Sequence, residues 1–412
     1  MTPCRVVVTG WGAVSPLGLS ADALWDGLAH GRSGIDFIRC FDASDFPIKV
    51  SGEVRNLPEG PEPLPRTLAM AYSAASEAAG QAGLAALSKS ARCGVFCGST
   101  ADWPNVEELV DAYRNIQKTQ RPATGPSALL ASRRMRLGAM PALIARRLGI
   151  ADRTRAANVV DDACASGGMI IGEAFQLLRR GALDVAVAVG ASSWTNLVGI
   201  TLYHKLSALS TEPTVDACRP FDAKRSGFVM AEGAGALVLE TLDHARARGA
   251  VPLAEVTGYG CTVSAYRITD MPDDGIPQLR AMEFALRDAR RTAADVDYIN
   301  AHGTATLQND VVETRAIHQL LGARAPEVPI SSNKSMVGHT ITAAGTLEAI
   351  ASIYTIRNGI VPPTINLHNR DEDCDLDYVP NVSRARPTNV VISNSFGFGG
   401  QNCALVLEAY AA

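Results

Sequence analysis

The chain has 412 residues, of which 47% are hydrophobic and 19% are charged. This composition is typical of a folded globular protein and excludes a disordered or collagen-like chain. The formal net charge is −4, from 38 basic and 42 acidic residues. The chain as a whole therefore has no excess positive charge that would attract nucleic acid or an anionic membrane.

Two repeated stretches indicate an internal duplication. The pattern Val-Thr-Gly-aromatic-Gly occurs in Arg5–Gly12 and again in Leu253–Gly260. Ala236–Glu240 then recurs letter for letter as Ala404–Glu408. Since both pairs occur in the same order, a duplication explains them better than chance. It also suits the length of the chain, which exceeds what one simple core supports.

We therefore predict a first half at residues 1–250 and a second half at 251–412. Both halves alternate helix-like segments with short, continuous apolar runs, which are typical of parallel strands covered on both faces. The predicted strands are Cys93–Gly98, Ala156–Val160, Asp184–Gly190, Asp297–Ala301, Val328–Ser332 and Asn389–Ser393. The sequence thus predicts an α/β architecture in which two halves pack together and helices cover the sheets.

The cysteines indicate a reduced environment. Nine cysteines are scattered along the chain, without a C-x-x-C pair or a Cys/His cluster of zinc spacing, so we expect no metal site. The N-terminus shows no signal peptide, and a cytoplasmic location fits best. The longest apolar runs, such as Val185–Ala191, have the length of a strand, so no membrane span is expected.

The first half is longer than the second because of an insertion at roughly residues 100–150. It contains Arg133, Arg134 and Arg136, followed by Arg146 and Arg147. Such insertions often contact partners or line a substrate entrance. A solvated charged face is an equally good explanation.

Cys164 ends an apolar run and precedes a predicted helix. Gly167 and Gly168 follow it, and Met169–Gly181 has apolar residues at helical spacing, with arginines in the last turn. At a strand-to-helix turn the helix dipole favours a thiolate over a thiol, as a nucleophile requires. For an arbitrary cysteine, a buried inert side chain is the commoner role.

His302 directly follows a predicted strand and precedes a loop of small residues. Asn309 or Asp310, with Glu313 behind, is expected to cap the next helix. A single histidine is more often a core or surface residue than a catalytic one. The position of His302 directly after a strand favours a functional role, because ligands of α/β proteins bind outside the carboxyl ends of strands.

Two further stretches follow predicted strands of the second half. One places Lys334 and His339 five residues apart, and the other is the glycine-rich Asn394–Gly400. If the halves face one another, Cys164, His302, His339 and Lys334 converge at one site. The chain has no phosphate loop or dinucleotide-binding fingerprint.

Together these motifs resemble those of the β-ketoacyl-acyl carrier protein synthases of the KAS II type, which belong to the thiolase-like condensing enzymes. The resemblance covers essentially the whole chain and implies a duplicated αβαβα layered fold. The matching stretches are Asp161–Gly167, Cys218–Asp222, Gly227–Val229, Glu232–Gly235, His302–Thr304, Lys334–His339 and Gly397–Gly400.

The resemblance implies a decarboxylative Claisen condensation. Cys164 would take the acyl group from a carrier-protein thioester, with the backbone N–H groups of Cys164 and Phe398 as the oxyanion hole. His302 and His339 would donate hydrogen bonds to the malonyl thioester oxygen and stabilise the enolate left when carbon dioxide departs. The enolate carbon would then attack the acyl-cysteine.

The resemblance also implies supporting residues. Lys334, paired with Glu348, would keep the histidines oriented, and Phe398 would control access for malonyl. No bound cofactor is implied, because the acyl carrier protein brings its own 4'-phosphopantetheine arm. The predicted substrate-binding residues are Thr304, Thr306 and Thr269 for this arm, and Tyr203 for the wall of the acyl pocket.

The Cys/His/His set distinguishes this chain from relatives of the same fold. The corresponding set resembles Cys-His-Cys in thiolases and Cys-His-Asn in KAS III enzymes. The chain-length factor of type II polyketide synthases lacks the cysteine, so Cys164 favours the active subunit. A non-catalytic scaffold subunit and a cysteine thioester hydrolase using Cys164 and His302 stay open as alternatives.

Several positions depart from the family pattern. About three extra residues lie between Gly149 and Val159. At four positions this chain has a different residue from the usual one: Asp162 where threonine is usual, Ala231 where glycine is common, Arg267 where histidine is usual and Leu307 where proline is common. If buried nearby, Asp162 would oppose a thiolate at Cys164. Leu307–Asp310 is similar to the stretch in ketosynthases of type II polyketide pathways, including polyene pathways.

The sequence thus favours a polyketide ketosynthase paired with a homologous chain-length factor. The alternative is a homodimeric β-ketoacyl-acyl carrier protein synthase II of primary fatty-acid synthesis. Because carrier proteins are acidic, docking is expected to be salt-sensitive and to involve Arg133, Arg134 and Arg136.

Overall fold

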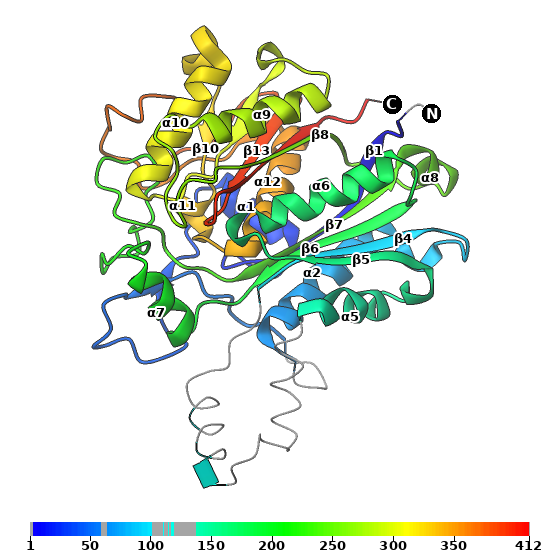
Figure 1. Cartoon of the computed structure of the whole chain (residues 1–412), viewed down its shortest axis with the longest axis horizontal. Coiled ribbons are helices and arrows are strands. Elements are labelled where there is room, and N and C mark those ends of the chain that lie inside the picture. The colour runs from blue at the N-terminus through cyan, green and yellow to red at the C-terminus, as the bar shows by residue number, and fades with distance from the viewer. Residues whose placement is uncertain are drawn as a thin grey trace.

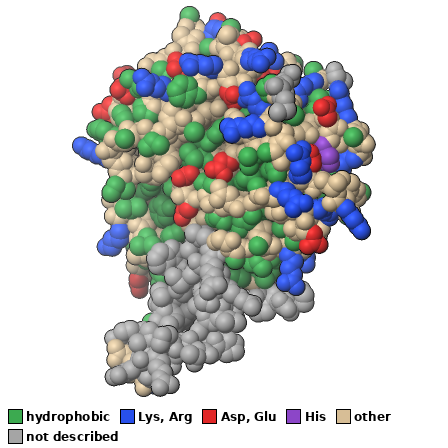
Figure 2. All heavy atoms as spheres, turned by 45° about the vertical axis from the view of Figure 1, so that its right-hand side comes forward, with side chains coloured by type: hydrophobic (Ala, Val, Ile, Leu, Met, Phe, Trp, Pro, Cys, Tyr) green, Lys and Arg blue, Asp and Glu red, His purple; other side chains and the backbone are tan. Residues whose placement is uncertain are grey.

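A computed structural model describes residues 3–58, 64–100, 110, 114, 117–118 and 137–411. Arg133, Arg134 and Arg136 lie outside the described residues, so carrier-protein docking at these arginines stays a prediction. Figure 2 shows one face of the molecule, on which basic and acidic side chains are interspersed over the described surface.

The described part of the chain forms a ten-stranded mixed sheet in the order β10-β9-β13-β14-β8-β1-β7-β6-β4-β5 (Figure 1). Its strands are β1 (Val6–Val14), β4 (Cys93–Gly98), β5 (Thr154–Val160), β6 (Val185–Ser192), β7 (Gly233–Thr241), β8 (Ala254–Val263), β9 (Tyr298–Asn300), β10 (Ile330–Ser331), β13 (Val390–Phe396) and β14 (Gln401–Glu408). Two small sheets pair β2 (Asp36–Phe37) with β3 (Val50–Ser51) and β11 (Ile360–Val361) with β12 (Arg384–Ala385).

Helices cover the sheet in three layers (Figure 1). One outer layer contains α2 and α5, the other contains α9 and α10, and α6 and α12 lie between the two halves of the sheet. The helices are α1 (Ala21–Ala29), α2 (Arg66–Ala82), α5 (Met140–Arg147), α6 (Ser166–Arg179), α7 (Leu197–Lys205), α8 (Leu242–Ala247), α9 (Ile276–Asp288), α10 (Leu307–Leu321), α11 (Lys334–Val337) and α12 (Ala344–Asn358). The predicted αβαβα layering is therefore confirmed.

The central helices approach each other closely because glycines face one another. A Cβ atom at Gly345 of α12 would come within 2.4 Å of the backbone nitrogen of Gly168 in α6, which is closer than side-chain carbons approach. Ten residues of α6 are buried, and the first twelve of α12 are too. Both helices contribute to one apolar core with strands of both halves.

The six predicted strands are present, with ends that differ by up to three residues. The predicted capping of the helix after His302 was wrong. Helix α10 begins at Leu307 with Thr306 as its N-cap residue, and Asp310 lies within its first turn. The Asp310 carboxylate is fully buried and accepts the backbone N–H of Phe221 at 2.7 Å, from a segment 89 residues away.

The repeated stretches adopt the same local structure. In both strand pairs, β1–β7 and β8–β14, the register shifts at the threonine of the repeat, Thr9 or Thr257. The Thr9 hydroxyl donates to Glu240 at 2.5 Å, and the Thr257 hydroxyl donates to Glu408 at 2.8 Å. Since an identical bulge in two separate pairs suits a duplicated unit, we propose that the chain divides near residue 250. Among the described residues, no helix is both long and apolar enough to cross a membrane.

Candidate active site

Cys164 lies in a sharp turn between β5 and α6. It is the middle residue of a 3₁₀ turn, Ala163–Ala165, and only 3% of its surface is exposed. Ala163 has φ 47°, a conformation that costs a non-glycine residue free energy and that recurs at functional sites. The Ser166 hydroxyl braces the turn: it accepts the Asp162 N–H at 2.8 Å and donates to the Ala163 carbonyl at 2.7 Å.

His339 contacts the sulfur of Cys164 directly. Its Nε2 atom lies 2.9 Å from Sγ. The backbone N–H of Ile341 donates to Nδ1 at 3.2 Å, so the ring proton of the neutral histidine resides on Nε2. His339 therefore points an N–H donor into the site and has no free acceptor for the thiol proton.

His302 enters the same site from the end of β9. Lys334 Nζ lies 3.4 Å from His302 Nδ1, so Nε2 again carries the proton. The Glu313 carboxylate accepts the backbone N–H groups of His302 and Gly303 at 2.9 and 2.8 Å. The rings of His302 and His339 are 5.5 Å apart and nearly perpendicular. The Cys164 sulfur and one nitrogen of each ring all lie within 4.8 Å of one another.

Lys334 and Glu348 form a buried ion pair behind the histidines. Their exposed fractions are 2% and 3%, and Nζ contacts Glu348 Oε1 directly. Burial raises the pKa of Glu348, while the charge of Lys334 and its hydrogen bond act in the lowering direction. Lys334 thus contacts both Glu348 and His302, so its ion pair with Glu348 holds the ammonium group in place as a donor to His302 Nδ1.

Burial and the charge of Lys334 keep both imidazoles neutral. Burial lowers the pKa of His302 well below its usual value, and Lys334 and His339 lower it further. Burial followed by the charge of Lys334 lowers the pKa of His339 in the same way. Two neutral rings with protonated Nε2 atoms suit a site that stabilises a developing negative charge on oxygen, because fixed donors there need no reorientation.

The prediction that the turn favours a thiolate at Cys164 was wrong for the resting site. Burial raises the pKa of the Cys164 thiol to about 12, although Lys334 and the backbone N–H groups of Phe398 and Cys164 act in the opposite direction. Glu348 is a carboxylate that raises this pKa further. Burial raises the pKa of Cys403, and Cys261 and the half-buried Asp162 raise it further, whereas Asp162 is not among the groups that shift the pKa of Cys164. Loss of water around the sulfur therefore outweighs the helix terminus.

This pKa predicts how alkylation of Cys164 depends on pH. Only the thiolate reacts with iodoacetamide, so the rate should rise about tenfold per pH unit from about pH 7 to about pH 10, without levelling off. Because the histidines are neutral, no inflection is expected near their usual pKa of about 6.5. Mass spectrometry of the peptide containing Cys164 measures the rate. A plateau beginning below about pH 8 would instead indicate a thiolate–imidazolium pair.

A cavity of about 210 Å³ opens onto these groups. Cys164, His302 and His339 line it, and so does Phe398. The three threonines predicted for the arm, Thr269, Thr304 and Thr306, line the same cavity. Tyr203 lies elsewhere: it belongs to the apolar cluster around Cys164, with its ring stacked on Phe398 at 6.5 Å and edge-on to Phe228 at 5.8 Å.

Sequence reasoning missed the buried carboxylates beneath the histidine loop. Glu313 and Asp310 are fully buried; Glu313 accepts the backbone N–H groups of the nearby His302 and Gly303, and Asp310 accepts that of the distant Phe221. The sequence does show two acidic residues after a loop of small residues, but this pattern suggested that they cap the next helix and not that they are buried. A sulfur and two imidazole nitrogens are ligand types of zinc; the absence of a bound metal stays a prediction from the sequence.

Models of known families match both halves of the chain. The Beta-ketoacyl synthase N-terminal domain matches residues 4–245, and the Beta-ketoacyl synthase C-terminal domain matches residues 253–368. The 3-oxoacyl-[acyl-carrier-protein] synthase 2 of Rhizobium meliloti (strain 1021) is 39% identical, over 98% of this chain and 99% of that protein.

Two solved structures cover 99% of this chain and their own full length. One is the AntDE:AntF complex, a type II PKS acyl-carrier protein with its ketosynthase bound to the hexaketide; it has a TM-score of 0.88 and 32% identity. The other is the ishigamide ketosynthase/chain length factor, with a TM-score of 0.87 and 34% identity. The chain belongs to the β-ketoacyl synthase family, within the thiolase-like condensing enzymes.

Proposed function

We propose that the protein condenses an acyl thioester with malonyl-acyl carrier protein to give a β-ketoacyl-acyl carrier protein and carbon dioxide. The observation that carries this proposal is the cluster of one sulfur and two neutral imidazole donors within 4.8 Å, on the lining of one cavity. The likeness to a 3-oxoacyl-[acyl-carrier-protein] synthase over nearly the whole chain supports it.

In the first step Cys164 attacks the thioester carbonyl of the acyl carrier protein. The bond to the phosphopantetheine sulfur breaks, and the proton of the Cys164 thiol ends on that leaving thiol. The backbone N–H groups of Cys164 and Phe398 both act on the sulfur, so they are placed to donate to the oxyanion beside it. Because burial raises the pKa of the Cys164 thiol to about 12, the resting site holds the thiol, and its proton must leave as the sulfur attacks.

In the second step His302 and His339 bind the thioester oxygen of the malonyl group through their Nε2–H donors. Carbon dioxide leaves, and the resulting enolate is stabilised by both hydrogen bonds. The enolate carbon attacks the acyl carbonyl on Cys164, the carbon–sulfur bond to Cys164 breaks, and the departing thiolate takes up a proton from solvent to restore the resting thiol. Neutral rings are required, because the dry site would otherwise have to hold extra buried charge.

Lys334 and Glu348 position the histidines rather than react. The ammonium group donates toward His302 Nδ1 and thereby holds the proton of that ring on Nε2. Phe398 lies between the cavity and the apolar cluster that contains Tyr203. We assign Phe398 the control of malonyl access and Tyr203 a place in the wall of the acyl pocket.

The phosphopantetheine arm of the carrier protein would occupy the cavity that leads to Cys164. The hydroxyls of Thr304 and Thr306 lie 2.9 Å apart on its lining, and Thr269 lines it as well. They suit the amides of the arm, which offer both donors and acceptors. No resident cofactor is part of this proposal.

The pathway we propose is a type II polyketide pathway, with a homologous chain-length factor as partner. The likeness to the ishigamide ketosynthase/chain length factor and to the AntDE:AntF complex supports this assignment. The likeness to the synthase of Rhizobium meliloti supports the alternative, a β-ketoacyl-acyl carrier protein synthase II of primary fatty-acid synthesis that acts as a homodimer. A reduced, cytoplasmic setting remains a prediction from the nine unpaired cysteines.

Reconstitution with purified components tests the reaction. The protein is supplied with an acyl-carrier protein thioester and malonyl-acyl carrier protein, and products are identified by mass spectrometry. We expect a product two carbons longer that carries a β-keto group, with one equivalent of carbon dioxide. Free acid without carbon dioxide would identify a thioester hydrolase instead. Running the assay with this chain alone and then with an added chain-length-factor homologue distinguishes a heterodimer from a self-sufficient homodimer.

A further inference from the structure

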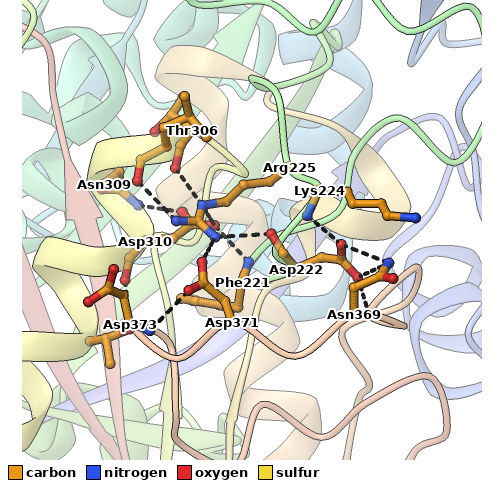
Figure 3. Close-up of polar contacts among 12 residues, drawn as sticks. Phe221, Asp222, Lys224, Arg225, Thr306, Asn309, Asp310, Asn369, Asp371 and Asp373 are labelled. Atoms are coloured by element: carbon orange, nitrogen blue, oxygen red, sulfur yellow. Dashed lines mark hydrogen bonds and ion pairs between the residues drawn. The ribbon is translucent and has the colours of Figure 1, made fainter.

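Arg225 is a buried guanidinium that holds the loop after His302. Only 6% of its surface is exposed. Nε donates to the Thr306 carbonyl at 3.2 Å, and Nη2 donates to the Leu307 carbonyl at 3.1 Å. Nη1 donates to the Asp222 carbonyl at 3.0 Å and contacts the Asp371 carboxylate (Figure 3). The side chain thus joins three chain segments.

The loop that Arg225 holds is strained. Gly303 and Ala305 have φ of 37° and 67°, and such a conformation persists in alanine only when the surroundings hold it. Contacts from two other parts of the chain hold the loop in this conformation. The Gly227 N–H donates to the Ala305 carbonyl at 2.9 Å, and Asp310 lies with Oδ2 3.9 Å from Arg225 Nε. Thr304 and Thr306, on either side of Ala305, carry the hydroxyls that line the cavity.

Two carboxylates, those of Asp310 and Asp371, face this single guanidinium. Asp310 is fully buried, and Asp371 is largely buried against Arg225. Asp222 directs its carboxylate elsewhere, to the backbone N–H groups of His368 and Asn369 (Figure 3). A planar fork with several fixed donors is required to reach two adjacent carbonyls and a carboxylate at once, and lysine does not provide it.

We propose that Arg225, acting with Asp310 and Asp371, is the positioning residue of the segment Thr304–Thr306 that binds the phosphopantetheine arm. This proposal rests on the proposed function, since it assigns that arm to the threonine hydroxyls. Without the guanidinium, the carbonyls of Thr306 and Leu307 lose their separate donors, Nε and Nη2, and the strained loop relaxes. The hydroxyls then spend less time in the binding geometry, so binding weakens while the chemistry at Cys164 persists.

The Arg225→Gln variant of the full-length protein tests this. We expect the KM for an acyl-pantetheine thioester to rise at least about tenfold, with kcat for acylation of Cys164 changed less than about threefold. Alkylation of Cys164 by iodoacetamide should be unchanged, because this small reagent does not use the arm site. Hydrogen exchange of the amides at residues 303–307 should accelerate. Arg225→Lys should give an intermediate KM.

Arg248→Gln is the matched control. Arg248 also forms a buried ion pair, with Glu240, and also donates to a backbone carbonyl, that of Ala82. Its partners lie in β7 and at the end of α2, and Arg248 is not among the residues that line the cavity. We expect this variant to lose stability but to keep the wild-type KM and wild-type exchange at residues 303–307.

An unchanged KM and unchanged exchange in folded Arg225→Gln would overturn the proposal. So would an equal loss of alkylation and acylation, which indicates general distortion of the site. If Arg225→Gln does not fold, Asp371→Asn takes its place, with an expected rise in KM of about threefold; an unchanged KM there overturns the proposal equally. Failure of the proposed function is distinguishable, because then the wild type forms no β-keto product.

Discussion

Replacing Cys164 by alanine should abolish condensation, with a loss of at least about 10⁴-fold, while decarboxylation of the malonyl thioester continues. The two outcomes separate because different residues serve the two half-reactions. Acyl transfer needs the sulfur, whereas the enolate is stabilised by His302 and His339. Both rings keep their supports in this variant, since Lys334 and the Ile341 N–H contact their Nδ1 atoms.

The measurements are carbon dioxide release from malonyl-acyl carrier protein and the mass of an acyl adduct on residue 164. Cys97→Ala is the matched control, since this thiol is equally buried but lies inside β4; it should retain both activities. Condensation that persists in Cys164→Ala would make this chain a scaffold subunit. Loss of decarboxylation together with condensation would contradict the assignment of the enolate step to the histidines.

Replacing Lys334 by alanine should be the most destabilising change in the site. It leaves Glu348 buried without its cation, which typically costs about 3–5 kcal/mol in the free energy of unfolding. It also removes the donor to His302 Nδ1, so the ring proton is free to move to the wrong nitrogen. We expect decarboxylation to fall by about 10²–10³-fold. Urea unfolding and carbon dioxide release measure the two effects.

The pH dependence of this variant follows from Glu348. Burial already raises its pKa, and Lys334 opposes that rise, so the pKa climbs further without the lysine. A carboxyl whose pKa is raised on folding contributes stability below its unfolded pKa of about 4.3 and loses it as the pH rises through the folded value. The destabilisation of Lys334→Ala should therefore grow from about pH 5 toward neutrality.

A double variant separates stability from chemistry. Lys334→Met with Glu348→Leu removes both buried charges, which is often neutral or stabilising. We expect it to recover most of the lost unfolding free energy but none of the lost decarboxylation. Recovery of both would mean that the ion pair is needed only for folding, and that His302 keeps its tautomer without a cation beside it.

The sequence was informative where the structure is local or repeated. The repeats at Thr9 and Thr257 predicted the duplication, and both threonines occupy equivalent bulges. Continuous apolar runs predicted the strands, and strand ends placed His302 and Cys164 on one cavity. Each of these inferences needs only a short window of residues and the rule that ligands bind at strand ends.

The sequence was misleading where the environment of a group comes from distant segments. The turn at Cys164 suggests a thiolate, but the apolar cluster around it draws on residues from 38 to 398, and their exclusion of water decides the pKa. Asp310 looks like a helix cap, yet Arg225 and Phe221, more than 80 residues earlier, determine its role. No local window contains such partners.

The crossing of α6 and α12 at Gly168 and Gly345 has a consequence for how the chain can be divided. Each half contributes one of these two helices, and each helix lies against strands of both halves. A fragment ending near residue 250 would therefore leave one face of its strands bare and one helix without a neighbour. If the chain divides near residue 250, neither part is expected to fold alone, because α6 and α12 pack against each other across the division and Cys164 and His339 lie just before these helices.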